Sequence, residues 1–316
     1  MVDLYGRNYR IYKQQQLNMN NVIYNPKDYI AQYIEYLNIC FPNWGGRELY
    51  DWVYKREIGP HKPDFIILTN EDDEVIAGSG ITYRNIKTKS GIVLKIGVFT
   101  GSWTLPNARG RGCFTQIIEE FTKLCTDKKI DFLTAFVTES NASYRRFESI
   151  GFQYFQADNI FSNLDFDYSN FGLEVRKIAC NPEAIYSVYE DFMEQNAGYY
   201  YSFEEFSGQY LQRTLEVQVL QIEDTIFVAE ENESTFRILY YSAFNVQHLM
   251  AFSDWVSKEK QKKVMFFLTD KSQIEFCRIN NFSIAPSFLT FQQTSSNVLA
   301  NDSTFNSFAI NLADKM

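Results

Sequence analysis

The chain has 316 residues, of which 45% are hydrophobic and 17% aromatic, so it can bury one large core or two ordinary ones. A disordered chain and a small disulfide-stapled protein are therefore excluded. The net charge of -9 argues against a protein that neutralises the phosphate backbone of a nucleic acid. Because only two histidines are present, a histidine-rich metal centre is excluded as well, and we expect no metal cofactor.

The cysteines and the apolar runs indicate in which cellular compartment we expect the protein. The five cysteines are widely spaced and form no C-x-x-C pair, which is typical of free thiols in a reducing compartment. The segment Met1 to Arg10 is polar, and apolar runs such as Val264 to Leu268 are too short to span a bilayer. We expect a soluble, cytoplasmic protein without membrane or nucleic-acid partners, and the oligomeric state is left open.

The first half of the chain alternates between helical and strand patterns. A strand-like stretch lies at Tyr9 to Tyr12, and helices are predicted after Asn25-Pro26 and over Arg47 to Lys55. Three predicted strands form an antiparallel meander: Phe65 to Leu68, Glu74 to Arg84 and Gly91 to Thr104. A helix then carries one apolar face, which consists of Phe114, Ile117, Ile118, Phe121 and Leu124. The strand Asp131 to Thr138 follows this helix, and the order predicts a parallel β-α-β crossover.

The next segments complete one unit and begin another. A short helix is predicted over Ala142 to Ile150, with Gly151 as its C-terminal cap, and a final strand over Phe152 to Phe161. Because Asp165 to Gly172 is rich in turn residues, we expect a linker at 165–172 between a domain at 1–164 and another at 173–316.

The order of elements recurs in the second half. A helix after Asn181-Pro182 is followed by strands at Val217 to Ile222, Thr225 to Glu230 and Phe236 to Ala243, a helix at Gln247 to Lys258, a strand at Lys263 to Thr269 and a closing helix. We interpret the recurrence as an internal duplication, with chance similarity of two α/β halves as the alternative.

The residues richest in chemical information are Arg109-Gly110-Arg111-Gly112, between a predicted strand and a predicted helix. Glycines there remove the Cβ atoms that would block an anion, and the unpaired N–H groups of the first helical turn point toward it. The turn therefore predicts a phosphate or pyrophosphate ligand. The dinucleotide-binding pattern G-x-G-x-x-G and a following G-K-[ST] are both absent.

This segment resembles the acyl-CoA site of the GNAT N-acetyltransferase superfamily, whose motif is [QR]-x-x-G-x-[GA]. Arg109 and Gly112 match its first and fourth positions, and Thr104-Leu105-Pro106 matches the lead-in, while Phe114 replaces a small residue. The resemblance implies contacts with acetyl-CoA or another acyl-CoA from Trp103, Thr104, Leu105, Arg109, Gly110, Arg111, Gly112, Cys113 and Phe114.

A second segment, Ser140 to Phe152, resembles the later family motif N-x-x-[SA]-x-x-x-Y-x-x-x-G-F. Phe147 stands where the family often has the tyrosine that protonates the leaving thiolate, and Tyr144 is the nearest substitute. The resemblance adds Ser140, Ser143 and Phe147 to the expected cofactor contacts. Glu139, at the end of the crossover strand, is a candidate base toward the amine or a solvated carboxylate.

The resemblance implies an α/β (α+β) fold of two tandem GNAT-like units, each a mixed, mainly antiparallel sheet flanked by helices. The second unit is expected to be degenerate, because Ser242 to His248 has neither glycine nor arginine. The implied activity is acyl transfer from acetyl-CoA or another acyl-CoA to a primary amine of a small-molecule or peptide acceptor, by direct attack.

Other functions stay open at this point. A non-catalytic acyl-CoA-binding or scaffold protein would account for Phe147. A tandem-GNAT aminoacyl-transferase is disfavoured by the retained Arg109/Gly112 turn and the net charge of -9. The tyrosines Tyr199 to Tyr201 suit either contact with an acceptor or packing between the units.

Overall fold

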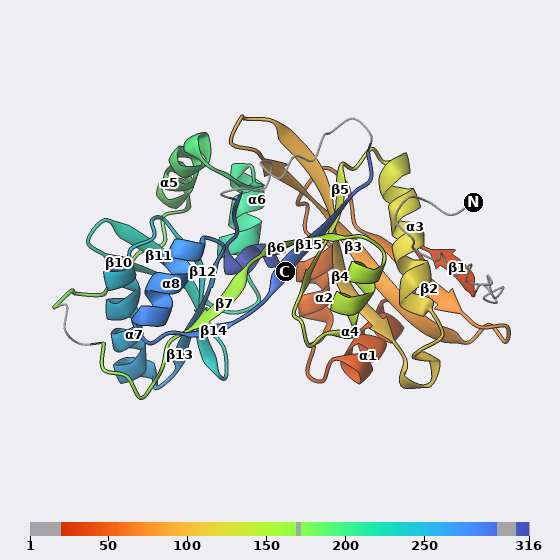
Figure 1. Cartoon of the computed structure of the whole chain (residues 1–316), viewed down its shortest axis with the longest axis horizontal. Helices are drawn as coiled ribbons and strands as arrows, with labels where there is room; N and C mark the ends of the chain where they lie inside the picture. The colour runs from red at the N-terminus through yellow and green to blue at the C-terminus, as the bar shows by residue number, and fades with distance from the viewer. Residues whose placement is uncertain (1–19, 169–171, 296–307, 316) are drawn as a thin grey trace, which may run out of the picture.

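A computed structural model describes residues 20–168, 172–295 and 308–315 of the chain, and Figure 1 shows two lobes joined along a central seam. The expected strand at Tyr9 to Tyr12 lies outside these residues, as do residues 169–171 of the expected linker. No helix of the described ranges is both long and apolar enough to cross a membrane.

The N-terminal unit follows the predicted order of elements. Its elements are β1 (Asn21–Tyr24), α1 (Ile30–Cys40), α2 (Arg47–Tyr54), β2 (Asp64–Thr69), β3 (Val75–Lys87), β4 (Val93–Thr104), the 3-10 turn η1 (Pro106–Ala108), α3 (Cys113–Asp127), β5 (Phe132–Val137), α4 (Ala142–Ser149), β6 (Gln153–Gln156) and β7 (Asp158–Phe161). The strand β1 has no counterpart among the predicted elements. The strand predicted over Phe152 to Phe161 was wrong as a single element, because Ala157 separates β6 from β7.

The C-terminal unit repeats this order. Its elements are β8 (Arg176–Ile178), α5 (Pro182–Gln195), β9 (Ala197–Tyr200), α6 (Phe203–Phe206), the π-helical turn η3 (Ser207–Leu211), β10 (Val217–Ile222), β11 (Thr225–Glu231), β12 (Thr235–Tyr241), α7 (Val246–Lys260), β13 (Lys263–Leu268), α8 (Lys271–Ile279), β14 (Ser283–Ala285), β15 (Phe288–Gln293), β16 (Phe308–Ala309) and the 3-10 turn η4 (Leu312–Lys315). Each unit has a three-stranded meander, a helix of 15 residues and a parallel strand in succession, as expected for an internal duplication.

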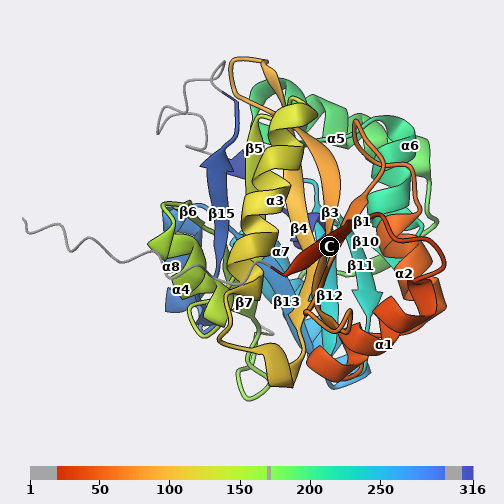
Figure 2. The ribbon, with the colours of Figure 1, turned by 90° about the vertical axis from the view of Figure 1, so that its right-hand side faces the viewer.

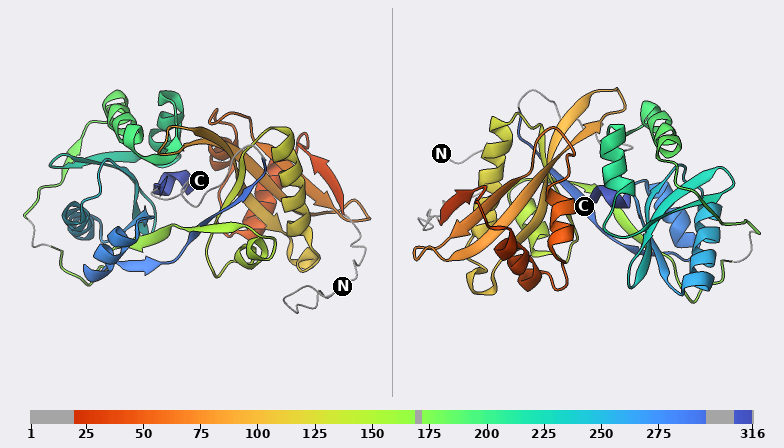
Figure 3. Two further views of the ribbon diagram at one scale, coloured as in Figure 1. Left: turned by 45° about the horizontal axis from the view of Figure 1, so that its top comes forward. Right: turned by 180° about the vertical axis from the view of Figure 1, so that it is seen from behind.

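The two units exchange a strand with each other. In the first sheet, β15 of the C-terminal unit lies between β5 and β6 and is antiparallel to both. In the second sheet, β7 of the N-terminal unit lies between β13 and β14 and is antiparallel to both. Figure 3 shows these strands crossing the seam in both views. Each sheet therefore contains strands from both units.

A parallel strand pair separates in each unit. β4 and β5 pair from Ile96 opposite Phe132 to Val98 opposite Thr134, and β4 then continues to Thr104 without β5 as a partner. β12 and β13 likewise pair only at their first three positions. The diverging ends of β4 and β5 leave a wedge in the first sheet, and the predicted glycine-arginine turn follows the free end of β4.

Two groups of side chains pack helices against the first sheet near this wedge. The apolar face predicted for α3 is buried at Ile117, Ile118 and Phe121, and α3 lies along β5 in Figure 2. Helices α1 and α2 instead pack their tyrosines around Trp103 on β4. The start of α3 and the end of β4 are thus both held by buried residues, and the turn between them is exposed.

Candidate acyl-CoA site

The turn between β4 and α3 has the backbone of an anion site. Gly110 and Gly112 adopt positive φ angles of 79° and 82°, a region that favours glycine. Gly112 is the N-cap of α3 and supplies no side-chain cap, and the first bond of the helix runs from the Gln116 N–H to the Gly112 carbonyl at 3.1 Å. The N–H groups before Gln116 have no partner within the helix, so they are available to a phosphate.

The cations of the turn are exposed to solvent. Arg109 and Arg111 both lie at the surface, and the Arg109 Nε donates to the Thr104 carbonyl oxygen at 3.4 Å. A Cβ atom built on Gly110 would meet no heavy atom within 4 Å, so the space beside the turn is open. Two guanidinium groups beside open space and free N–H groups suit a pyrophosphate.

β4 carries a bulge that the sequence prediction missed. Its register against β3 shifts between Gly78 opposite Trp103 and Gly80 opposite Thr100. Gly101 lies in the bulge with a φ of 62°. A bulge takes a residue out of the ladder, so β4 has one residue more than β3 here. A glycine inside a predicted strand was the signal that could have found it.

Tyrosines from the two N-terminal helices hold this bulge in place. The Tyr33 hydroxyl donates to the Gly101 carbonyl at 3.2 Å, and the Tyr54 hydroxyl donates to the Thr100 carbonyl at 3.0 Å. Both tyrosines are buried. The bulge therefore has a fixed geometry, as a group that polarises a carbonyl in the transition state requires.

The lead-in residues offer backbone rather than side chains to a cofactor. Trp103 is 3% exposed, with its ring 4.9 Å from that of Tyr36, and Leu105 packs against the same aromatic cluster. Thr104 is partly exposed, and its carbonyl oxygen also accepts from the Cys40 thiol at 3.4 Å.

Cys113, in the first turn of α3, is a buried packing residue. It is 2% exposed, and its Sγ lies 3.8 Å from the Ala108 carbonyl oxygen. Burial raises the pKa of the Cys113 thiol, which makes it a poor nucleophile. Only its backbone N–H remains available to a ligand of the turn.

Phe114 and Phe147 share one aromatic core beneath the turn. Their ring centroids lie 5.4 Å apart, and Phe147 also contacts Phe99 at 5.5 Å and Phe152 at 4.5 Å. Phe147 is 1% exposed, so its side chain presents no surface to a ligand in this arrangement. The bulky residue at the sixth motif position is thus accommodated by packing inward.

Tyr144 packs at the edge of the same hydrophobic cluster, beside a residue of the second unit. It is partly exposed, and its ring is 4.8 Å from Tyr154 and 5.4 Å from Phe288, which belongs to β15. The Tyr154 hydroxyl donates to the Tyr144 carbonyl oxygen at 2.7 Å. The second unit therefore contributes a side chain next to the expected proton donor.

The remaining expected residues lie where β5 ends and α4 begins. Glu139 and Ser140 are exposed, and Ser143 is partly exposed. The Ser140 hydroxyl lies 3.0 Å from the Thr138 hydroxyl. These groups stand at the far side of the wedge from the glycine-arginine turn, because they follow β5 whereas the turn follows β4.

At the corresponding turn of the second unit, the side chain of Asn245 occupies the helix start that an anion would need. Asn245 caps α7 and accepts from the N–H groups of Gln247 and His248 at 2.9 and 3.4 Å. A cavity of about 770 Å³ nevertheless opens beside β12, with Tyr240, Asp270 and Phe155 among its lining residues. Phe155 comes from β6, so this cavity adjoins the seam.

Comparison with known proteins agrees with this architecture. Residues 22–154 match the model of the acetyltransferase (GNAT) domain. A search of curated protein sequences gives no significant match. A GCN5-related N-acetyltransferase from Anabaena variabilis is similar in structure, with a TM-score of 0.62, 15% identity and coverage of 87% of this chain and 73% of that one.

Two further solved structures are similar. A probable N-acyltransferase from Enterococcus faecalis has a TM-score of 0.63, 9% identity and coverage of 87% of this chain and 72% of that one. A tandem GNAT protein from the clavulanic acid biosynthesis pathway has a TM-score of 0.57, 11% identity and coverage of 88% of this chain and 100% of that one. Residues 22–154 of the first unit therefore match the GNAT acetyltransferase domain, and the chain is similar in fold to a tandem GNAT protein.

Proposed function

We propose that the chain transfers an acetyl or other acyl group from acyl-CoA to a primary amine of a small-molecule or peptide acceptor. The observation that carries the proposal is the turn Arg109 to Gly112, which combines two positive-φ glycines, two exposed arginines and an uncapped helix start. By position, the cofactor contacts we propose are Trp103 to Leu105, Arg109 to Phe114, Ser140, Ser143 and Phe147, with the buried side chains contributing through backbone or packing.

The reaction we propose is a direct attack. The amine nitrogen forms a bond to the thioester carbonyl carbon, and the bond from that carbon to sulfur then breaks. Backbone N–H groups at the β4 bulge stabilise the oxyanion. Glu139 or a water that it orients accepts the proton from nitrogen, and Tyr144 gives a proton to the CoA thiolate.

The acceptor would lie in the wedge between β4 and β5, with Phe288 of the second unit beside Tyr144.

The compartment and the domain bounds are proposals as well. The five cysteines are free in the described structure, and acyl-CoA is a metabolite of the cell interior, so we propose a cytoplasmic location. We also propose 1–164 and 173–316 as the two sequence units, with 165–172 as their linker.

The second candidate function is that of a non-catalytic acyl-CoA-binding or scaffold protein. It is favoured by Phe147, a buried residue without a hydroxyl at the family's usual donor position. Such a protein would bind acetyl-CoA but release no thiol with any amine acceptor.

The binding site is tested by placing a carboxylate in the turn. Gly110→Glu sets a negative charge against the pyrophosphate, so we expect it to abolish the stabilisation by acetyl-CoA, which is about 2.7 kcal/mol at a hundredfold excess over Kd. Gly91→Glu is the matched control, because Gly91 has a φ of 85°, equally open surroundings and a place in the distant β3–β4 hairpin. Thermal unfolding with and without acetyl-CoA measures both.

If acetyl-CoA still raised the melting temperature of Gly110→Glu, the assignment of the turn would be refuted.

Calorimetry on the intact chain should give one acetyl-CoA per chain, because Asn245 occupies the helix start of the second unit. Thiol release over a panel of amines then separates the enzyme from the binding protein.

A further inference from the structure

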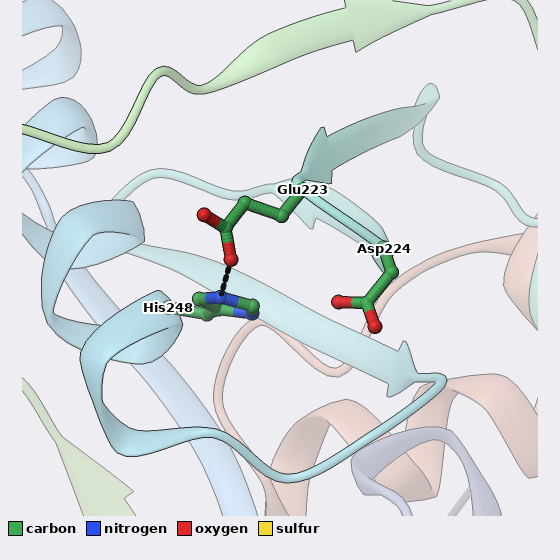
Figure 4. Close-up of side chains that lie close together, drawn as sticks. All are labelled: Glu223, Asp224 and His248. Atoms are coloured by element: carbon green, nitrogen blue, oxygen red, sulfur yellow. Dashed lines mark hydrogen bonds and ion pairs between the residues drawn. The ribbon is translucent and has the colours of Figure 1, made fainter.

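A second cluster of chemically active side chains lies in the C-terminal unit, away from the glycine-arginine turn. Glu223 and Asp224 form the turn between β10 and β11, and His248 lies in the first turn of α7. One donor atom from each of the three residues lies within 4.8 Å of the others. Figure 4 shows the Glu223 carboxylate above the imidazole and the Asp224 carboxylate to its right.

The imidazole is held in a fixed orientation. His248 is 3% exposed, and its Nδ1 lies 2.8 Å from the hydroxyl of Thr225, which is itself buried. Its Nε2 is directed outward and lies 3.1 Å from the Glu223 carboxylate. Histidine ligands of metals are commonly oriented in this way, by a hydrogen-bond partner on the ring nitrogen that does not bind the ion.

The backbone fixes the other two ligands. Glu223 has a φ of 51° in the tight hairpin that joins β10 to β11, and Asn245 caps the helix turn that carries His248. The Glu223 side chain is 64% exposed, so an ion can enter from solvent. Among the described residues, neither carboxylate of the hairpin forms an ion pair with a lysine or an arginine.

We propose that Glu223, Asp224 and His248 form a binding site for a divalent transition-metal ion of the zinc type. One imidazole nitrogen and two carboxylate oxygens suit such an ion, whereas calcium and magnesium prefer oxygen ligands alone. Water completes the coordination sphere. The ion would fasten the β10–β11 hairpin to α7, and it takes no part in acyl transfer, which belongs to the other unit.

The test uses the rarity of histidine in this chain. The full chain, purified without a histidine tag and labelled with ¹⁵N-histidine, has two imidazoles, those of His61 and His248. Addition of Zn²⁺ should shift the signals of His248 alone, and calorimetry should show one Zn²⁺ per chain. Asp224→Asn and Glu223→Gln should each weaken Zn²⁺ binding about 10-fold or more.

Three variants complete the design. Thr225→Val keeps the shape of a buried side chain but removes the Nδ1 partner, and it should weaken Zn²⁺ binding about 10- to 100-fold. Asp72→Asn removes an exposed carboxylate from the β2–β3 turn of the other unit, and His61→Gln removes the other imidazole; both should leave Zn²⁺ binding unchanged. Zn²⁺ binding that is absent, or that Asp224→Asn leaves intact, would overturn the proposal.

Discussion

Tyr144 and Phe147 lie three residues apart on α4 but meet different surroundings. Phe147 is enclosed by other phenylalanines, whereas Tyr144 is partly exposed beside Phe288. Of the two positions, Tyr144 is thus the one that carries a hydroxyl and is partly exposed.

We predict that Tyr144→Phe lowers turnover by about 10²- to 10⁴-fold, the usual contribution of a positioned acid, and leaves the Kd for CoA nearly unchanged. Thiol release under steady-state conditions and calorimetry measure the two quantities. Tyr200→Phe is the control, because Tyr200 is 40% exposed on β9. Full activity in Tyr144→Phe would mean that the thiolate takes its proton from water.

The burial of Phe147 leads to a separate prediction. Phe147→Tyr would place a hydroxyl among the rings of Phe99, Phe114 and Phe152, and an unpaired buried hydroxyl costs about 1–3 kcal/mol. We therefore expect a less stable protein with no gain in turnover, measured by chemical denaturation and by the thiol assay. A gain in turnover at unchanged stability would show that position 147 reaches the thiolate.

At the scale of elements, the exchange of β7 and β15 predicts how the chain behaves when it is cut. A fragment of residues 1–164 lacks β15, so β5 and β6 have no common neighbour in the first sheet. We expect this fragment alone to aggregate or to unfold without cooperativity, and we expect coexpressed 1–164 and 173–316 to assemble one to one. Size-exclusion chromatography and circular dichroism distinguish these outcomes. A cooperatively folded 1–164 monomer would contradict the prediction.

The exchange also shows what the sequence could and could not predict. The strand Val217 to Ile222 was predicted with its observed bounds, because alternation and flanking turn residues are local signals. The Arg109 to Gly112 turn was equally local. The partners of β7 and β15 were not predictable, because periodicity identifies a strand but not its neighbour, and Glu223 meets His248 only through the fold.

At the scale of the whole molecule, one hydrophobic core spans both units. It joins Ile96 and Phe132 of the first sheet to Tyr189 and Tyr240 of the second unit. β9 extends this connection by pairing with β3, and Tyr199 and Tyr201 are buried there. These two tyrosines pack between the units, which favours the second of the two roles considered for them.

The last described turn inserts a carboxylate into this core. Asp314 is 2% exposed, and it accepts from the hydroxyls of Tyr201 and Tyr210 at 2.9 and 2.6 Å. Burial raises the pKa of Asp314 to about 6, against the hydrogen bonds that lower it. The folded state therefore holds this proton more tightly than the unfolded state, and stability from this group falls as the pH rises from about 4 to about 6.

We expect Asp314→Asn to remove this loss of stability at rising pH. Relative to the unchanged chain, the variant should gain on the order of 2–3 kcal/mol in unfolding free energy between pH 4 and pH 7, measured by denaturant titration at each pH. Asp51→Asn is the control of opposite sign, because Lys55 and Arg47 hold the pKa of Asp51 below its usual value. A difference between the chain and Asp314→Asn that does not vary with pH would contradict the raised pKa.

The position of β15 also sets the order in which the protein can be completed during synthesis. Thr290 bonds to the carbonyl of Ala135, 155 residues earlier, so β5 leaves the ribosome roughly 8 to 30 seconds before its neighbour at 5–20 residues per second. During that time β5 and β6 expose strand edges to other nascent chains. The proposed acyl-CoA turn is therefore made early, but the sheet that supports it closes only after residue 293 has been translated.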